Sequence, residues 1–407
     1  MTAATVRSDI VLSADQERAL DGILVWLDDW DRQVLTMGGL AGTGKSFLIS
    51  RLLADLNQRV AVCAFTGKAA NVLRRKGIEK ACTMHKLLYV CMPCCRCCNQ
   101  TACMCRCQRC NEPAILCACP QPNVCGCCAK KLTDCLCGKE STRFVRVPQI
   151  DVDLVIVDEA SMLNSRLVAD LESFGKKVLY AGDHGQLEAI GDNPGLMMNP
   201  DLRLEEIHRQ ARDSHIIKFA HYLREGGSPG RWIGYKQPDL KIFGGLPDDP
   251  TAYDVIICGF NKTRVAMNKV VRERLGYHGT LPQVGEWIIC LKNNSDFGVF
   301  NGQRFQVMEG SPVDKDRMLL SLADEDGNVF KNLPALTDQF GMEKTLEYTP
   351  RDVCLFDYGS VITCHKSQGS QWDRVAVIEE IGRGWKPRRW SYTAATRAAK
   401  ELHYFVR

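Results

Sequence analysis

The segment that most constrains the fold of this chain is residues 39–46, which read Gly-Leu-Ala-Gly-Thr-Gly-Lys-Ser. It matches the pattern G-x-x-x-x-G-K-[ST], follows an apolar run at 33–37 that predicts a strand, and precedes a helical stretch that continues to residue 56. Glycines allow successive N–H groups to curl around a phosphate, and the helix N-terminus adds the positive end of its dipole. The sequence therefore predicts a nucleotide-binding α/β domain.

The end of this loop carries the residues with the most specific predicted roles. Lys45 is predicted to reach the β- and γ-phosphates, and the Ser46 hydroxyl is predicted to bind Mg²⁺. The loop residues predicted to hold the nucleotide are Gly42, Thr43, Gly44, Lys45 and Ser46. An accidental glycine turn is the alternative interpretation, and the strand and helix on either side argue against it.

Two acidic residues, Asp158 and Glu159, follow a fully apolar run at 154–157 that predicts a buried strand. A carboxylate at the carboxyl end of a neighbouring parallel strand lies where bound Mg²⁺ needs a ligand. We therefore expect Asp158 to bind Mg²⁺ and Glu159 to polarise the attacking water. Together with the glycine loop, this pair predicts hydrolysis of ATP or GTP.

The rest of the chain has the alternation of apolar runs and helical stretches that is typical of parallel-sheet α/β domains. From 281 to 346 the pattern changes to short β-like runs separated by turns such as Asn301-Gly302, which indicates a small β insertion. The predicted organisation is a first α/β domain at 1–90 and 140–200 with an insertion at 91–139, and a second α/β domain at 201–280 and 353–407 with a small β insertion at 281–352.

The first insertion is anomalous in composition, because it holds 16 of the 22 cysteines and no histidine. Zn²⁺ favours four thiolates in a tetrahedron, so the segment could hold up to about four ions. An iron–sulfur cluster, a metal-buffering segment and disulfides are the alternatives. The predicted zinc ligands are Cys91, Cys94, Cys95, Cys97, Cys98, Cys103, Cys105, Cys107, Cys110, Cys117, Cys119, Cys125, Cys127, Cys128, Cys135 and Cys137.

The bulk properties are those of an ordinary globular protein. The net charge of +4 neither demands nor excludes nucleic acid as a partner. No apolar run approaches the roughly eighteen residues of a membrane span. The first ten residues lack the apolar core of a signal peptide, so we expect a cytoplasmic protein with no membrane partner.

Seven short segments resemble the motifs of superfamily 1B DNA helicases of the RecD/Dda-like group. They are Ser13-Ala14-Asp15-Gln16 (Q motif), residues 64–70 (motif Ia), Thr83-Met84-His85, residues 182–187 (motif III), His208-Arg209-Gln210 (motif IV), residues 363–370 (motif V) and residues 392–398 (motif VI). The resemblance extends over nearly the whole chain outside the cysteine segment. It implies two RecA-like domains, with an SH3-like fold in the small β insertion.

The resemblance also assigns roles to individual residues. It implies that Gln16 contacts adenine, that Gln186 senses the γ-phosphate, and that Gly369 belongs to the nucleotide site. Arg209 and Arg397 lie in the second α/β domain and fit the role of arginine fingers, because hydrolysis coupled to domain closure needs positive charge from that domain. The residues expected to contact DNA are Phe65, Thr66, Lys68, His85, Thr363, His365 and Lys366.

Two positions depart from the family pattern, since Phe65 and Ala189 stand where proline is usual. Phe65 could stack on a base, as aromatic side chains do without reading sequence. The alternative is a buried phenylalanine at the end of a strand.

The function implied is that of a monomeric, ATP- and Mg²⁺-dependent DNA helicase that moves 5′→3′ on single-stranded DNA and acts at junctions with duplex DNA. The cysteine segment occupies the place where related helicases carry a β-hairpin that splits the duplex, so we expect a zinc module that acts as wedge or clamp. The alternative is a single-strand-stimulated ATPase that remodels protein–DNA complexes, with the module as a docking platform for a replication protein.

Overall fold

The computed structural model describes residues 12–95, 140–188, 192, 194–207, 213–294, 296–347, 349–350 and 352–407. The chain divides into two compact units, one formed by 1–84 with 152–407 and the other by 85–151. We describe each unit by itself.

The first sheet of the larger unit is entirely parallel and has the strand order β3-β2-β6-β7-β1-β8. Its strands are β1 (Val34–Gly39), β2 (Val60–Ala64), β3 (Cys82–Thr83), β6 (Leu154–Asp158), β7 (Lys177–Gly182) and β8 (Leu202–Leu204). The central strand β6 is buried along its whole length, which explains its uninterrupted apolar sequence.

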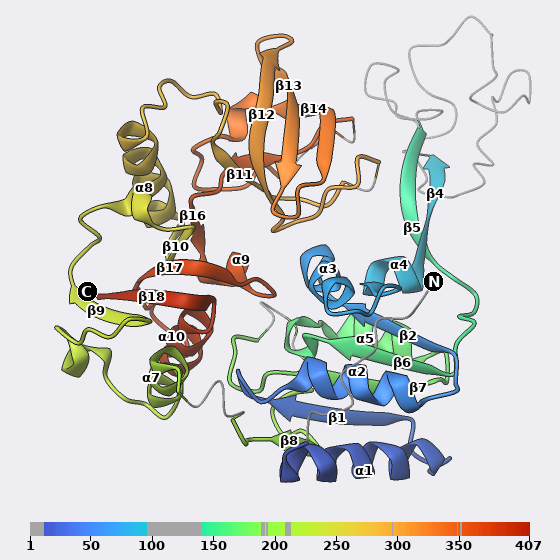
Figure 1. The fold of residues 1–407 in the computed structure, drawn as a ribbon. Coiled ribbons are helices and arrows are strands. Elements are labelled where there is room, and N and C mark those ends of the chain that lie inside the picture. The colour runs from blue at the N-terminus through green and yellow to red at the C-terminus, as the bar shows by residue number, and fades with distance from the viewer. Residues whose placement is uncertain are drawn as a thin grey trace, which may run out of the picture. The chain divides into compact units, whose positions relative to one another are not determined.

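Helices connect these strands and cover the sheet. They are α1 (Ala14–Asp28), α2 (Lys45–Asp55), α3 (Gly67–Arg75) and α5 (Ser165–Glu172), with a short 3-10 helix η1 (Ala160–Met162). Helix α1 runs along β8 and β1 (Figure 1). It places the apolar side chains of Ile23 and Trp26 in the same core as Met37 and Leu48. A helix whose apolar stripe is buried in this way is held mainly by packing.

The second parallel sheet has the order β16-β10-β17-β18-β9. Its strands are β9 (Leu240–Gly244), β10 (Val255–Cys258), β16 (Val361–Thr363), β17 (Trp372–Ile378) and β18 (Ala398–Val406). The helices of this part are α7 (His215–Arg224), α8 (Asn261–Arg274), α9 (Cys364–Ser367) and α10 (Pro387–Ala395), with η2 (Pro229–Trp232) and η3 (Pro250–Ala252). Phe219, Trp390 and Tyr404 are fully buried in its core.

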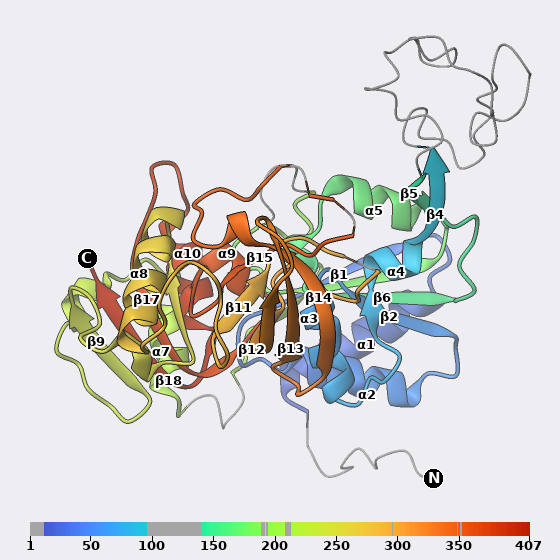
Figure 2. The same ribbon diagram turned by 90° about the horizontal axis from the view of Figure 1, so that it is seen from above.

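A third sheet is antiparallel, with the order β14-β13-β12-β11-β15. Its elements are β11 (Trp287–Cys290), β12 (Arg304–Pro312), β13 (Arg317–Asp324), β14 (Val329–Leu336), η4 (Thr337–Gln339) and β15 (Phe356–Tyr358). The long strands β12, β13 and β14 lie side by side in both views (Figures 1 and 2). Phe305 and Phe356 meet edge to face in the core of this sheet.

A buried ion pair joins this sheet to α8. The Asp357 carboxylate on β15 is fully buried, and it accepts hydrogen bonds from the Arg264 guanidinium and from the N–H groups of Gly341 and Tyr358. Removing one partner of such a pair leaves the other charge buried without compensation, which is costly.

We expect Asp357→Ala to lower the free energy of unfolding by roughly 3–5 kcal/mol, as measured by chemical denaturation. Asp352→Ala is the matched control, because Asp352 is 66% exposed and forms a surface pair with Arg317. Exposed pairs contribute only about 0–1 kcal/mol. Equal losses of stability in the two variants would contradict this interpretation of the buried pair.

The smaller unit contains a two-stranded antiparallel ribbon formed by β4 (Tyr89–Cys95) and β5 (Glu140–Arg146), preceded by α4 (Met84–Leu88). The strands lie side by side in both views (Figures 1 and 2). Of the predicted zinc ligands, Cys91, Cys94 and Cys95 belong to β4, and the other thirteen lie outside the described residues. The zinc prediction therefore remains a prediction.

The two parallel sheets confirm the predicted α/β fold class with two RecA-like sheets. Strand β9 lies within residues 226–250, a stretch rich in glycine and proline from which no strand is predicted. This edge strand pairs with β18 and buries only alternate side chains, Leu240 and Ile242, so its signal is short and weak. Among the described residues, no helix is long and apolar enough to cross a membrane.

Candidate active site

Three neighbouring strands of the first sheet, β6, β7 and β1, bring the predicted catalytic residues to one edge. Strand β6 ends at Asp158, β7 is followed by Asp183, and β1 leads into the glycine loop. The carboxyl ends of parallel strands meet at the same edge of a sheet, where ligands of open α/β sheets bind. The fold therefore gathers the loop and the acidic residues that lie far apart in sequence.

The glycine loop has the backbone form of a phosphate cradle. Gly42 and Gly44 have φ values of 83° and 77°, a left-handed conformation that favours glycine. The Thr43 hydroxyl donates to the Leu40 carbonyl over 2.8 Å. The Lys45 ammonium donates to the carbonyls of Gly39 and Leu40, so its charge lies against the loop. This arrangement fits a bound polyphosphate.

Gln16 is fully buried and fixed from both ends of its amide. Its Nε2 donates to the carbonyl of Thr43 over 3.0 Å, and its Oε1 accepts from the N–H of Ser13 over 3.1 Å. The structure thus places the Q-motif glutamine against the glycine loop. Contact with adenine remains a prediction.

The acidic pair lies directly after β6. The Asp158 carboxylate accepts from the N–H of Glu159 over 2.9 Å. Glu159 has a φ of 55°, which is uncommon for a residue other than glycine. Its Oε2 is buried and has no hydrogen-bond partner among the described residues. Such an oxygen is available to a water molecule, as a residue that polarises the attacking water requires.

Charges from both parallel sheets act on this glutamate. Burial, and after it the charge of Asp158, raise the pKa of the Glu159 carboxyl. Arg397 and Lys45 act in the opposite direction. Asp158 ends strand β6 of the first sheet, Lys45 begins α2 beside it, and Arg397 follows α10 of the second part, so charges from both parts bear on Glu159.

Arg397 is 4% exposed and is held by its own part of the chain. Its guanidinium donates to the carbonyls of Thr393 and Ser370 over 3.0 and 3.1 Å, and to the Thr396 hydroxyl over 3.1 Å. Arg209, the other predicted arginine finger, lies outside the described residues. Of the two predicted arginine fingers, the structure therefore describes Arg397.

Tyr392 bridges the two parallel sheets. Its hydroxyl accepts from the N–H of Ala41 in the glycine loop over 2.7 Å and donates to the Asp183 carboxylate over 2.9 Å. Asp183 also accepts from the N–H of Gly185 and from the Gln186 amide. Asp183 and Tyr392 fall within the segments that resemble motifs III and VI, and the sequence predicts a role for neither. The available signal was an acidic residue directly after a buried strand.

Gln186, the predicted γ-phosphate sensor, lies in the same network. Its Nε2 donates to Asp183 over 3.1 Å, and its carbonyl accepts from Arg389 over 3.1 Å. Its side-chain Oε1 is buried and has no hydrogen-bond partner among the described residues. Ser46, a predicted Mg²⁺ ligand, accepts from the Lys76 ammonium over 3.1 Å. Hydroxyl and carboxylate oxygens form a donor set suited to Mg²⁺.

Motifs Ia and V lie close together at one point, at Thr66 and Gly369. The Thr66 hydroxyl caps α3 by accepting from the N–H of Ala69 over 3.1 Å. A Cβ added at Gly369 would lie 3.3 Å from that hydroxyl, so Gly369 is beside motif Ia. Phe65 is half-buried directly after β2, and of Lys68 the structure describes only the backbone, within α3. His85 belongs to the other unit, where its ring contacts Tyr89 and burial lowers its pKa.

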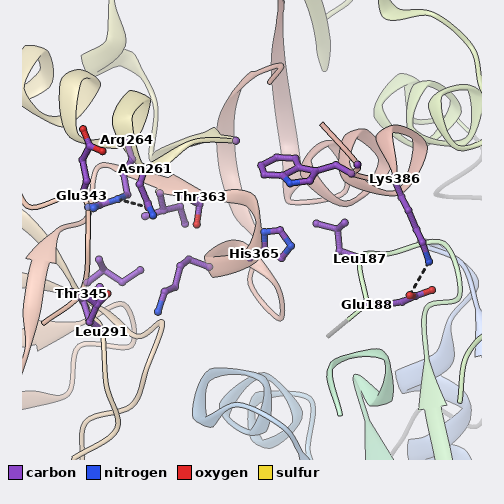
Figure 3. A pocket seen from close by; sticks show the side chains of 16 residues that line it. Leu187, Glu188, Asn261, Arg264, Leu291, Glu343, Thr345, Thr363, His365 and Lys386 are labelled. Carbon is purple, nitrogen blue, oxygen red and sulfur yellow. Dashed lines mark hydrogen bonds and ion pairs between the residues drawn. The ribbon is translucent and has the colours of Figure 1, made fainter. Parts of the chain in front are cut away.

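A cavity of about 610 Å³ opens beside motif V, lined in part by Thr363, His365 and Lys366. Figure 3 shows Thr363 and His365 between Arg264 and Asn261 on one side and the Lys386–Glu188 ion pair on the other. Burial lowers the pKa values of His365 and Lys366, so the imidazole is neutral near pH 7. The Lys366 ammonium donates to the Asn301 side chain.

Comparison with known proteins agrees with this geometry. Residues 11–237, more than half of the chain, match the family model described as an AAA domain. The chain belongs to the AAA-domain family. Residues 358–404 of this AAA-domain protein match a second model, the UvrD-like helicase C-terminal domain. The two matches confirm the superfamily 1B part of the resemblance, and they do not address the zinc-binding insertion.

Individual relatives are distant. The ATP-dependent RecD2 DNA helicase of Deinococcus radiodurans is 25% identical over an alignment covering 95% of this chain and 48% of the relative, so the chain spans about half of that protein. A structure of two coordinating Pif1 helicases at forked double-stranded DNA has a TM-score of 0.55 at 16% identity, covering 97% of this chain and 92% of that one. Bacteroides Pif1 bound to single-stranded DNA has a TM-score of 0.54 at 14% identity with the same coverage. These likenesses show a Pif1-like helicase fold.

Proposed function

We propose that this AAA-domain protein is an ATP-dependent DNA helicase that translocates on single-stranded DNA. The observation that carries the proposal is the direct link between the two parallel-sheet parts at the glycine loop, where the Tyr392 hydroxyl accepts from the N–H of Ala41 and donates to the Asp183 carboxylate. A site divided in this way responds to the relative position of its two halves. Hydrolysis can therefore drive a movement between them.

Each residue has a defined part in the proposed reaction. Lys45 and the N–H groups of the glycine loop bind the phosphates, and Glu159 orients the attacking water through Oε2, which has no hydrogen-bond partner among the residues described. Arg397 stabilises the charge that develops on the transferred phosphoryl group. Mg²⁺ bound with ATP would neutralise phosphate charge, and Ser46 and Asp158 are the residues that would hold it. Gln186 and Arg209 complete the proposed γ-phosphate contacts.

The hydroxyl of Tyr392 gives the two halves a direct mechanical link. Because it binds both the N–H of Ala41 and the carboxylate of Asp183, a phosphate that reorders the glycine loop must change a bond made by α10. Tyr392 is therefore a positioning residue in the proposed coupling of ATP binding to domain movement.

We expect Tyr392→Phe to keep the buried ring packing and to lose both hydrogen bonds. An unsatisfied buried group costs about 1–3 kcal/mol, so ATP turnover should fall by roughly tenfold, and fewer bases should be traversed per ATP. The measurement is ATPase rate beside translocation rate on oligo(dT). Tyr235→Phe is the control, because Tyr235 is packed at the edge of the core of the second sheet. An unchanged ratio of translocation to hydrolysis in Tyr392→Phe would contradict the coupling role.

The proposed nucleic-acid path follows motifs Ia and V. Two similar proteins support this path: the Deinococcus relative is a DNA helicase, and a solved structure of this fold contains single-stranded DNA. We propose that Phe65, Thr66, Lys68, Thr363, His365 and Lys366 contact the strand, with His85 as a further contact, and that movement is 5′→3′. Monomeric action, with a replication protein as an additional partner, belongs to the same proposal.

We further propose that the cysteine segment binds zinc and acts at the junction of single-stranded and duplex DNA. The support is the cysteine content of the segment. The chain enters and leaves it through a two-stranded ribbon, in which seven residues of β4 pair antiparallel with seven of β5. We expect the purified protein to contain several zinc ions per chain by elemental analysis. A protein without zinc, or with iron in its place, would contradict this assignment.

The proposed activity is tested by measuring ATP hydrolysis with and without single-stranded DNA. We expect strong stimulation by oligo(dT) and loss of hydrolysis in Lys45→Ala. Lys262→Ala, at the start of α8, is the control for removal of a lysine. Hydrolysis that ignores single-stranded DNA would contradict a nucleic-acid motor.

A further inference from the structure

A basic segment with a central tryptophan spans the end of the connection from β17 to α10 and the first residues of α10. Residues 382–389 read Gly-Arg-Gly-Trp-Lys-Pro-Arg-Arg, with four cations in eight positions. We call residues 379–386 the tryptophan loop. Its sequence lies outside the helicase motifs, between motif V and motif VI. Aromatic residues interleaved with cations are typical of surfaces that bind single-stranded nucleic acid.

The Trp385 indole is held in a defined position by its neighbours. Its ring lies 5.3 Å from Phe260 and 6.1 Å from His365, measured between ring centroids. The backbone N–H of Trp385 donates to the Gly382 carbonyl over 3.1 Å, and a Cβ added at Gly382 would come within 2.7 Å of the indole. Any larger residue at position 382 would collide with the indole, so the close packing of the ring on this backbone requires glycine there.

The aromatic residues are gathered by the topology of the second sheet. Phe260 follows β10, His365 follows β16, and the tryptophan loop follows β17, and these three strands are neighbours. Trp385 and His365 line the cavity of about 610 Å³. Phe260 is 41% exposed and Trp385 is half-buried, so aromatic surface remains accessible at this edge.

Basic residues lie in the same segment as Trp385 and in the lining of the cavity. Lys386 and Arg389 both pair with the Glu188 carboxylate, at 2.9 and 2.7 Å. Arg383 is exposed and forms no ion pair with any residue that the structure describes. Lys366 also lines the cavity. An aromatic ring with an exposed guanidinium two residues earlier in the same loop matches a base and its adjoining phosphate.

We propose that Trp385 stacks on one base of the translocating strand, with Phe260 and His365 as its aromatic support and Arg383 binding an adjoining phosphate. This inference rests on the proposed function and adds a base contact to it. Stacking uses the face of the base, which all four bases share, so the contact holds any sequence. DNA and RNA strands offer the same chemistry at this site.

The test compares binding of oligo(dT) with binding of an abasic oligomer of equal length and charge, for the complete protein. We expect the wild-type protein to prefer oligo(dT), and Trp385→Ala to raise the Kd for oligo(dT) by roughly tenfold while leaving the Kd for the abasic oligomer unchanged. Trp385→Phe should retain much of the preference. Trp30→Ala is the matched control, because Trp30 is 95% exposed at the end of α1.

The possible results distinguish failure of the stacking contact from failure of the proposed motor. An unaltered preference for oligo(dT) in Trp385→Ala, with single-strand-stimulated ATPase intact, overturns the stacking contact and leaves the proposed motor standing. Absence of stimulation in the wild-type protein overturns the motor instead. A repeat with oligo(rU) identifies the strand: a loss of affinity on both polymers supports a shared base contact, and a loss on one assigns the contact to that nucleic acid.

Discussion

Glu159→Gln is expected to abolish ATP hydrolysis while ATP still binds. The Glu159 carboxylate has one buried oxygen that no described residue contacts by a hydrogen bond, and Glu159 lies directly after Asp158 at the edge where the glycine loop begins. The amide is nearly isosteric but cannot accept a proton, so the rate should fall by roughly 10²–10⁴-fold. The measurement is steady-state hydrolysis with saturating oligo(dT), beside binding of a fluorescent ATP analogue.

The matched control for this variant is Glu273→Gln on α8. Glu273 is exposed and forms only a long surface contact with Lys269, so its loss should leave hydrolysis unchanged. Hydrolysis by Glu159→Gln within about threefold of wild type would remove Glu159 from the proposed catalytic role.

Arg397→Lys is expected to lower kcat by as much as 10³-fold, because an arginine finger contributes on the order of 10³–10⁵. Lysine keeps the charge and loses the planar set of donors that binds Thr393, Ser370 and Thr396. The KM for ATP should change much less than kcat, since the finger acts on charge that develops during the reaction.

A structural role alone would give a different pattern. If Arg397 only held α10 in place, the variant would lose thermal stability in proportion to its loss of activity. The melting temperatures of Arg397→Lys and of the surface control Arg317→Lys should therefore be measured together with kcat. A fall in melting temperature with kcat unaffected in the folded fraction would contradict the catalytic assignment.

Much of the fold could be predicted from sequence because its signals are local. The patterns that predict the glycine loop and strand β6 each lie within eight consecutive residues. The carboxyl-edge rule for parallel sheets then places Asp158 beside the loop. Strand β9 was missed because it is short and at a sheet edge, where half of its side chains face outward.

The candidate site was predictable as a set of motifs but not as a network. The bond between Tyr392 and Ala41 joins residues 351 positions apart, and no periodic pattern encodes such a pairing. The cluster of Phe260, His365 and Trp385 depends on the strand order β16-β10-β17, which sequence alone leaves open. The residue types of the site could be predicted from sequence, but the contacts between residues far apart in the chain could not.

The measurement that tests the central claim most directly is strand displacement on two partial duplexes, one with a 5′ single-stranded tail and one with a 3′ tail, in ATP and Mg²⁺. Lys45→Ala serves as the inactive motor. The proposed function predicts unwinding of the 5′-tailed substrate alone, and none by Lys45→Ala. Unwinding from the 3′ tail would contradict the polarity, and hydrolysis stimulated by single strands without any unwinding would contradict the helicase and favour a translocase.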